Sequence, residues 1–285
     1  MARRETLTLR DGVAVITGAA SGIGAALALA LARAGMRLAL ADVNAAGLDG
    51  TAQRAREAGA ETSVHAFDIT DEAAIAALPA AVEAAHGRVS VLVNNAGVAL
   101  GGRFEQVDPA DFDWLMAVNF GGTVRMTRAF LPLLARERAA QVVNVSSVFG
   151  LLAPPGQTAY CASKFAVRGF SESLRHELEM EGSPIGVTLV HPGGVRTAIA
   201  ENARLAKGLD EAEIERHRTA WRALLALDAD EAARRIVRGI AAREPRVLVG
   251  RDAVAAAWLQ RFFPVGYWRH MSRDLERRVR SRQGP

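Results

Sequence analysis

The sequence predicts an α/β fold with a doubly wound parallel sheet of about seven strands. Short apolar runs of strand length alternate with longer amphipathic runs, and this alternation is typical of βαβ units. The strand cores at 13–16, 38–41 and 91–93 are almost continuously apolar, as parallel strands covered by helices on both faces require. The first apolar run also leads directly into a glycine-rich turn and a helical pattern, which places a βαβ unit at the start of the chain.

The individual elements follow one another in a regular order. We predict strands at 13–17, 37–43, 63–69, 89–96, 141–147, 186–191 and 246–250. Helical periodicity marks the stretch from the glycine turn to 34, and then 45–58, 71–85, 109–136 and 159–181. Because each helix carries the chain back across the sheet, successive strands are expected to run parallel.

The chain of 285 residues divides at one point in this pattern. We expect residues 1–250 to form a single α/β domain. Within it, residues 199–228 are helical in pattern and fall between the sixth strand and the helix before the seventh, so we hypothesise that they form a mobile lid over the carboxyl ends of the strands. Residues 251–285 lie outside the alternation and are predicted to form a C-terminal helical extension rich in aromatic residues and arginine.

Charge and cysteine content narrow the class of protein. The net charge is +4, but seven arginines between 261 and 282 face only Asp274 and Glu276, so the rest of the chain is close to neutral. This distribution does not favour a nucleic-acid partner. The single cysteine, Cys161, excludes an intramolecular disulfide and suits a reducing compartment. With a polar start and no long apolar run, we expect a soluble, cytoplasmic protein.

The turn after the first strand has the spacing G-x-x-x-G-x-G and opens a helix. Glycines allow the backbone to approach a pyrophosphate, and the helix N-terminus offers N–H groups and a positive dipole end. An isolated glycine triplet would fit a plain tight turn equally well, but the position between strand and helix favours a dinucleotide. The expected contacts are Thr17, Gly18, Ser21, Gly22, Ile23 and Gly24.

Asp42 ends the second strand, where a carboxylate can hydrogen-bond both ribose hydroxyls of the adenosine half. The same charge would repel the 2′-phosphate of NADP, so we predict NAD as the cofactor. The alternative is a plain helix cap beside Asn44.

Tyr160 and Lys164 are one helical turn apart, so they share a face of the predicted helix. A nearby ammonium favours the phenolate and lowers the pKa of a tyrosine, which makes the pair a candidate general base. Lys164 and Lys207 are the only lysines among 35 basic residues, which sets Lys164 apart from an arbitrary cation. Ser147 ends the fifth strand and could donate a hydrogen bond to the substrate oxygen; its neighbour Ser146 should point away.

Together these motifs resemble the short-chain dehydrogenase/reductase family, whose fold is Rossmann-like. The resemblance covers roughly residues 10–200. It rests on Thr17-Gly18-x-x-x-Gly22-x-Gly24, Asn94-Asn95-Ala96-Gly97, Asn119, Ser147, Tyr160-x-x-x-Lys164 and Pro192-Gly193-Gly194-Val195-x-Thr197.

The resemblance implies further roles. Asp68, with Ile69 beside it, would meet the adenine, and Asn95 and Gly97 would line the adenosine ribose. Asn119 would complete the catalytic set of Ser147, Tyr160 and Lys164 by holding a water in a proton relay, and Lys164 would also hold the nicotinamide ribose. Val195 and Thr197 would hold the carboxamide, within a cofactor-binding turn that includes Pro192 and Gly193. Family members usually form homodimers or homotetramers, which we expect here.

The motifs therefore predict an NAD-dependent oxidoreductase that moves a hydride between NAD and a secondary alcohol or ketone. The expected pocket walls are apolar, which favours a lipophilic small-molecule substrate; they are Val98, Leu100, Phe149, Leu151, Leu152 and the 199–228 segment. The alternatives are an NADP-dependent carbonyl reductase of the same fold and a non-catalytic dinucleotide sensor. Asp42 argues against the first, and the complete catalytic set argues against the second.

Two features remain outside this interpretation. His191 ends the sixth strand, but no metal-binding spacing accompanies it, so we predict a structural role and no metal. The extension carries Trp258, Phe262, Phe263, Tyr267 and Trp268, with Pro264 expected to break the helix. It could cover the site, seal a subunit interface, or contact a membrane surface through 258–282; we expect it to dock on protein.

Overall fold

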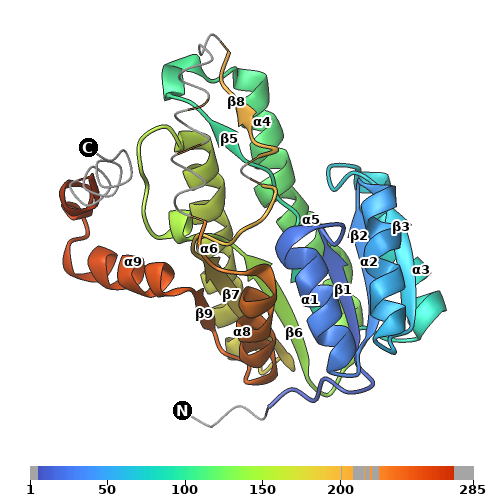
Figure 1. Ribbon diagram of the computed structural model, residues 1–285. Coiled ribbons are helices and arrows are strands. Elements are labelled where there is room, and N and C mark those ends of the chain that lie inside the picture. Colours follow the sequence, from blue (N-terminus) through green and yellow to red (C-terminus); the bar gives the residue numbers. More distant parts are fainter. Residues whose placement is uncertain (1–5, 200, 208–214, 216–218, 220–224, 273–285) are drawn as a thin grey trace.

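The computed structural model describes residues 6–199, 201–207, 215, 219 and 225–272 (Figure 1). Its centre is a parallel sheet of seven strands in the order β3-β2-β1-β4-β6-β7-β9. The order reverses between β1 and β4, which makes the sheet doubly wound and places the carboxyl ends of both strands at a site where α/β proteins bind ligands. The strands are β1 (Val13–Thr17), β2 (Arg37–Asp42), β3 (Thr62–Ala66), β4 (Val91–Asn94), β6 (Ala140–Val145), β7 (Ile185–Pro192) and β9 (Arg246–Val249).

Helices cover the sheet on both faces (Figure 1). One layer is formed by α1 (Gly22–Arg33), α2 (Ala45–Glu57) and α8 (Ala229–Ala241), and the other by α3 (Glu72–His86), α5 (Gly122–Leu134) and α6 (Thr158–Met180). Each layer packs on its own apolar core, in which Ile16 and Leu27 are fully buried on one side and Phe130 on the other. The strand residues are buried throughout β1, β4, β6 and β7, as expected of parallel strands covered on both faces.

The predicted fold class is confirmed, with differences at some element boundaries. β3 ends at Ala66, so Asp68 and Ile69 lie in the turn beyond the strand. The long helix predicted at 109–136 is divided into α4 (Pro109–Met116), a π-helical turn (Ala117–Gly121) and α5. This turn carries Asn119, and π-turns inside helices are frequent at functional sites.

Within the 199–228 segment, residues 204–205 form a strand where the sequence predicted helix. β8 (Arg204–Leu205) pairs with β5 (Leu100–Gly101) in a separate two-stranded sheet. Arg204 is ion-paired with Asp111 at 2.7 Å and its guanidinium lies 3.5 Å from the centre of the Trp114 ring. These contacts attach residues 204–205 to α4; residues 208–214 and most of 216–224 lie outside the described part of the chain.

The extension begins with α9 (Arg251–Phe262), which ends just before Pro264, as predicted. Helical residues resume at Tyr267, whose hydroxyl accepts a hydrogen bond from the backbone N–H of Ala153 at 3.0 Å. Among the described residues, no helix is both long enough and apolar enough to cross a bilayer.

Candidate active site

The glycine turn between β1 and α1 is shaped by residues that could not carry a side chain. Gly18 and Gly22 have φ values of +66° and +55°, a region that favours glycine. A Cβ on Gly24 would lie 2.0 Å from the carbonyl oxygen of Gly18, so α1 packs against the turn at a distance that only glycine allows. Ser21 is the N-cap of α1 but its side chain makes no capping bond, and Ile23 packs against the core beneath the turn.

Asp42 lies beside this turn at the end of β2. Its carboxylate accepts hydrogen bonds from the backbone N–H groups of Ala20 and Asn44, both at 3.0 Å. The first bond ties the side chain to the glycine turn itself, so the carboxylate is positioned by more than a local cap. The geometry fits the ribose-binding role predicted for Asp42.

Thr17 and Asn95 join the ends of β1 and β4. The hydroxyl of Thr17 accepts hydrogen bonds from the backbone N–H groups of Asn95 and Ala96, both at 3.0 Å. The side-chain amide of Asn95 donates to the carbonyl oxygens of Thr17 and Gly18 at 3.0 and 3.1 Å. Asn95 therefore joins the glycine turn to the end of β4, and its role at the adenosine ribose stays a prediction.

The remaining residues predicted for the adenosine half lie at the ends of β3 and β4. Asp68 is exposed, and its carboxylate accepts bonds from the backbone and hydroxyl of Thr70, both at 2.8 Å. Ile69 packs toward α5, where a Cβ on Gly122 would lie 2.7 Å from its side chain. Gly97 sits against the polar end of the site, because a Cβ there would lie 3.2 Å from Oδ1 of Asn119 and 3.3 Å from Nζ of Lys164.

The turn from Pro192 to Thr197 follows β7 and is held by a second segment. The backbone N–H of Arg196 donates to the carbonyl of Leu227 at 2.8 Å, and Leu227 donates back to the carbonyl of Gly194 at 3.0 Å. Val195 is buried and forms a parallel bridge with Leu227. Thr197 approaches the glycine turn, since a Cβ on Gly22 would lie 3.1 Å from its methyl group. The two turns therefore lie close together at Gly22 and Thr197.

Asp252, the second residue of α9, holds the same turn from the opposite side. Its carboxylate accepts a hydrogen bond from the backbone N–H of Gly194 at 2.6 Å. A Cβ on Gly193 would lie 2.1 Å from the same carboxylate, so glycine is required there. The predicted carboxamide-binding turn is therefore held by the C-terminal extension, a contact that the sequence analysis missed.

Ser147 and Tyr160 meet where β6 ends against the start of α6. The hydroxyl of Ser147 lies next to the phenol of Tyr160 and accepts a hydrogen bond from the backbone N–H of Phe149 at 3.1 Å. Ser146 points the other way and donates to the carbonyl of Lys164 at 2.8 Å. Strand alternation thus directs Ser147 toward the tyrosine and Ser146 toward the helix.

Lys164 is buried one turn below Tyr160. Its ammonium donates to the carbonyl of Val145 at 3.1 Å and lies 5.6 Å from the centre of the Tyr160 ring. The side chain is only 3% exposed, and the tyrosine 8%. The three predicted side chains are therefore brought together from β6 and two turns of α6.

Burial dominates the electrostatics of this group. It raises the pKa of Tyr160 to about 12, although the hydrogen bond from Ser147 acts in the opposite direction. Burial also lowers the pKa of Lys164 to about 8. The lowering of the tyrosine pKa that the sequence led us to expect is thus outweighed in this structure, and the phenol is protonated at neutral pH.

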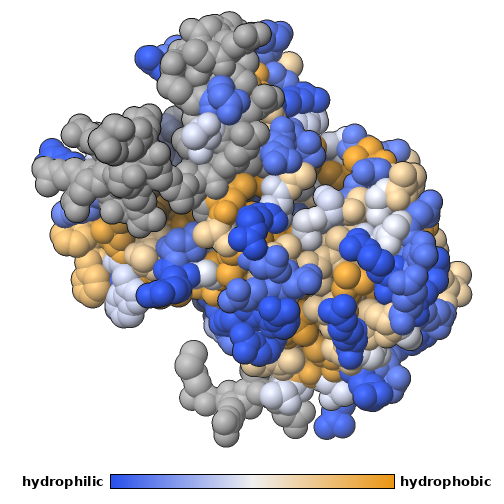
Figure 2. Space-filling model, in the orientation of Figure 1, coloured by the Kyte–Doolittle hydropathy of each residue, from blue (hydrophilic) through white to orange (hydrophobic). Residues whose placement is uncertain are grey.

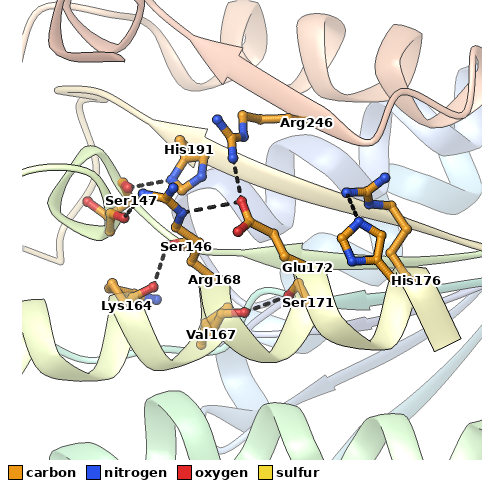
Figure 3. Close-up of polar contacts among 12 residues, drawn as sticks. Ser146, Ser147, Lys164, Val167, Arg168, Ser171, Glu172, His176, His191 and Arg246 are labelled. Atoms are coloured by element: carbon orange, nitrogen blue, oxygen red, sulfur yellow. Dashed lines mark hydrogen bonds and ion pairs between the residues drawn. The ribbon is translucent and has the colours of Figure 1, made fainter. Parts of the chain in front are cut away.

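A network of polar side chains from α6, β7 and β9 contacts the loop that begins at Ser147 (Figure 3). His191 is fully buried and its Nδ1 donates to the carbonyl of Ser147 at 2.8 Å; burial lowers its pKa to about 4, so it is neutral. Arg168 reaches the carbonyl of Gly150 at 3.4 Å and is paired with Glu172, which also binds Arg246 of β9. His191 therefore holds the backbone of Ser147 in place.

Asn119 is buried within the π-helical turn. Its Oδ1 accepts from the backbone N–H of Val98 at 2.8 Å, and its amide donates to the carbonyl of Val98 at 3.0 Å and the hydroxyl of Ser163 at 3.1 Å. Both amide hydrogens are thus used by the protein. Asn119 connects the loop after β4 to α6, and its role in a water relay stays a prediction.

An apolar cluster surrounds the tyrosine. Val98, Leu100 and Phe149 belong to it, together with Ile199, and the Phe149 ring meets Tyr160 edge-on at 6.2 Å. Leu151 and Leu152 do not, because they are buried in a separate cluster with Ala256, Tyr267 and Met271 of the extension. Their proposed place in the pocket wall is therefore wrong; they form the seat of the C-terminal extension.

Within the described ranges, no group of three or more histidine, cysteine, aspartate or glutamate residues is arranged to hold a metal ion. Cys161 is buried with its sulfur 3.9 Å from the carbonyl of Leu152.

The chain is similar in sequence to known proteins. A protein-family model described as short chain dehydrogenase matches residues 12–208. The putative oxidoreductase SadH of Mycobacterium tuberculosis (strain ATCC 25618 / H37Rv) is 44% identical over 261 residues, which cover 90% of this chain and 92% of the relative. A CLA biosynthesis dehydrogenase/reductase of Lactiplantibacillus plantarum is 35% identical over 205 residues, covering 70% and 71%.

The solved structures that resemble this chain include short-chain dehydrogenases and oxidoreductases. A short chain dehydrogenase/reductase from Burkholderia phymatum in complex with NAD has a TM-score of 0.84 at 35% identity, covering 90% of this chain and 95% of that one. A metagenomic short-chain oxidoreductase in complex with NADP has a TM-score of 0.68 at 33% identity, covering 85% and 98%. The sequence motifs, the sheet order and these matches agree that the chain belongs to the short-chain dehydrogenase/reductase family of oxidoreductases.

Proposed function

We propose that this protein is an NAD-dependent dehydrogenase/reductase that interconverts a secondary alcohol and its ketone. The observation that carries the proposal is the placement of the Ser147 hydroxyl next to the Tyr160 phenol, with the ammonium of Lys164 5.6 Å from the centre of the tyrosine ring. A hydroxyl and a phenol that lie together at the end of a strand can hold one substrate oxygen between them. A non-catalytic sensor would have no need of this arrangement.

The cofactor assignment rests on Asp42. Its carboxylate is fixed at the edge of the glycine turn by the Ala20 N–H, and a 2′-phosphate in the same place would meet a negative charge. Solved relatives include one in complex with NAD and one in complex with NADP, so family membership leaves both nucleotides open. The position of Asp42 supports NAD.

The nicotinamide ring supplies the hydride acceptor or donor when it is bound. In reduction, the Tyr160 phenol gives its proton to the oxygen that becomes the alcohol, and Ser147 orients and polarises that oxygen. In oxidation, the phenolate form of Tyr160 takes the hydroxyl proton and becomes the phenol. Lys164, held by the Val145 carbonyl, keeps a positive charge beneath the ring that favours the phenolate.

The surroundings of Tyr160 favour a lipophilic substrate. Val98, Leu100 and Phe149 pack around it, and the Phe149 ring lies edge-on to the tyrosine. A strongly hydrated substrate would lose its water against these side chains without replacement hydrogen bonds.

The test is a panel of lipophilic secondary alcohols and ketones, assayed with NAD(H) and NADP(H) in both directions. We expect turnover with a higher kcat/KM for NAD, and Asp42→Ala should reduce that preference. Asp71→Ala, which removes an N-cap carboxylate on α3, is the matched control and should leave it unchanged. Equal efficiency with both cofactors in the parent enzyme would contradict the assignment, and no turnover with any member of a broad panel would count against the reaction class.

A further inference from the structure

The outer face of α9 carries an apolar stripe that no described residue covers. Val254, Trp258 and Phe262 are spaced at intervals of four residues, so they lie on one side of the helix. Trp258 is 56% exposed and Phe262 64%, and their rings stack with centroids 5.6 Å apart and 9° between the planes. The inner side is already occupied, because Ala253 and Ala256 are buried against the rest of the chain. The outer stripe is therefore additional to the contacts that hold α9 in place.

Figure 2 shows hydrophobic residues gathered at the edge of the molecule where Figure 1 places α9. Val265, which follows the helix, is also almost fully exposed. Contiguous exposed aromatic and aliphatic side chains of this kind mark interaction surfaces in folded proteins.

The basic residues of α9 are Arg251 and Arg261, and both are exposed. Arg251 lies in line with the stripe, about two turns before Trp258, and Arg261 lies three residues after Trp258. The only acidic residue in α9 is Asp252, whose carboxylate accepts the Gly194 N–H. The sequence continues this bias, with seven arginines against two acidic residues between 261 and 282.

We propose that this face of α9 docks on the surface of an anionic lipid bilayer. The aromatic rings would enter the boundary between headgroups and acyl chains, where tryptophan is favoured, and the arginines would meet lipid phosphates. A second copy of the chain fits less well, because a two-fold contact would bring Arg251 and Arg261 of both copies together with no acidic side chain of α9 free to neutralise them. A bilayer of anionic lipids satisfies both the apolar and the charged part of the face.

Docking through α9 would hold the folded enzyme at the surface. The helix is attached at its start by the bond from Gly194 to Asp252. Ala256, Tyr267 and Met271 pack with Leu151 and Leu152. These contacts make the helix a rigid part of the protein, so no separate anchor segment is required. The proposal does not depend on the reaction or on the cofactor.

The test is co-sedimentation of the full-length protein with vesicles of phosphatidylcholine alone or of phosphatidylcholine mixed equally with phosphatidylglycerol. We expect binding to the mixed vesicles in low salt. Binding should be lost on phosphatidylcholine alone, and in 1 M salt, where the screening length falls to about 3 Å. The variant W258S/F262S should lower the partition constant by at least about tenfold. M180S is the matched control, since Met180 is 89% exposed at the end of α6 and should change nothing.

The single variants W258S and F262S should each shift binding in the same direction by a smaller factor, and thermal unfolding should confirm that all variants fold as the parent does. Absence of binding to the anionic vesicles, or equal binding by the parent and W258S/F262S, would overturn the proposal. Sedimentation velocity distinguishes the alternative. If W258S/F262S dissociates an oligomer while vesicle binding is absent or unchanged, the stripe is a subunit interface and the bilayer proposal is wrong.

Discussion

The substitution of Lys164 by methionine should stabilise the folded protein while abolishing its activity. Burial lowers the pKa of Lys164 from 10.5 to about 8, so at neutral pH the folded state holds a charge that it disfavours. At about 1.4 kcal/mol per pKa unit, the shift corresponds to roughly 3 kcal/mol. Methionine removes this cost. It also leaves the buried Val145 carbonyl without a hydrogen-bond donor, which destabilises the folded state by about 1–3 kcal/mol. The net gain at pH 7 is therefore small, and the pH dependence is the sharper observable.

Between pH 8 and 10.5 the unfolded chain keeps the Lys164 proton and the folded protein has lost it, so the parent gains stability as pH rises, by about 1.4 kcal/mol per unit. The stability difference between K164M and the parent should therefore move in the parent's favour by about 2–3 kcal/mol between pH 8 and 10. The raised pKa values of Tyr160 and Cys161 act in the opposite direction. Both groups remain protonated in the folded state between pH 8 and 10, with or without the Lys164 charge, so their effect is the same in the two proteins over this range.

The assay is urea unfolding of both proteins at fixed concentration across pH 7 to 10. Lys207 is the only other lysine and is exposed, so K207M is the matched control and should show no change relative to the parent over the same range. A stability difference between K164M and the parent that stays constant from pH 8 to 10 would refute the reasoning, because the buried lysine would then titrate as a solvated one.

Three further outcomes are expected. Asp252→Ala removes the acceptor of the Gly194 N–H and should raise the KM for NAD several-fold, with a smaller effect on kcat. The control Asp71→Ala should change neither constant. An unchanged KM in Asp252→Ala would show that the carboxylate does not position the turn. Because burial raises the pKa of Tyr160, alcohol oxidation should accelerate from neutral toward alkaline pH, and a maximum below pH 7 would contradict a phenol as the base. Truncation after Gly250 uncovers Leu151 and Leu152 and removes the Asp252 contact, so it should lower both the melting temperature and the turnover; a truncated protein equal to the parent in both would show that the extension is dispensable.

The fold could be predicted because its signals are local and repeated. The cores of β1 and β2 are apolar runs, and alternation with helical patterns favours a parallel sheet between helix layers. The candidate residues Asp42 and Ser147, at and just after strand ends, could be found because parallel strands end at a common edge.

The contacts that were missed join segments far apart in the chain. Asp252 binds Gly194 across 58 residues, and no periodicity relates the two. β5 and β8 have two residues each, too short for any strand pattern. Leu151 and Leu152 have the composition of a pocket wall, and only the path of the extension shows that they are covered by it. The π-turn at Asn119 leaves the helical periodicity on either side almost intact, so the sequence indicated a single long helix.

The role of Tyr160 as the group that exchanges the proton is tested most directly by Tyr160→Phe. The substitution removes one oxygen from a ring that is 8% exposed and packed edge-on against Phe149, so the fold should be retained. We expect NAD affinity, measured by titration, to remain close to that of the parent, and the turnover of the best alcohol in the panel to fall by about 10²-fold or more. If Tyr160→Phe bound NAD normally and kept more than about a tenth of the parent rate, the phenol would not be the acid and base of this enzyme.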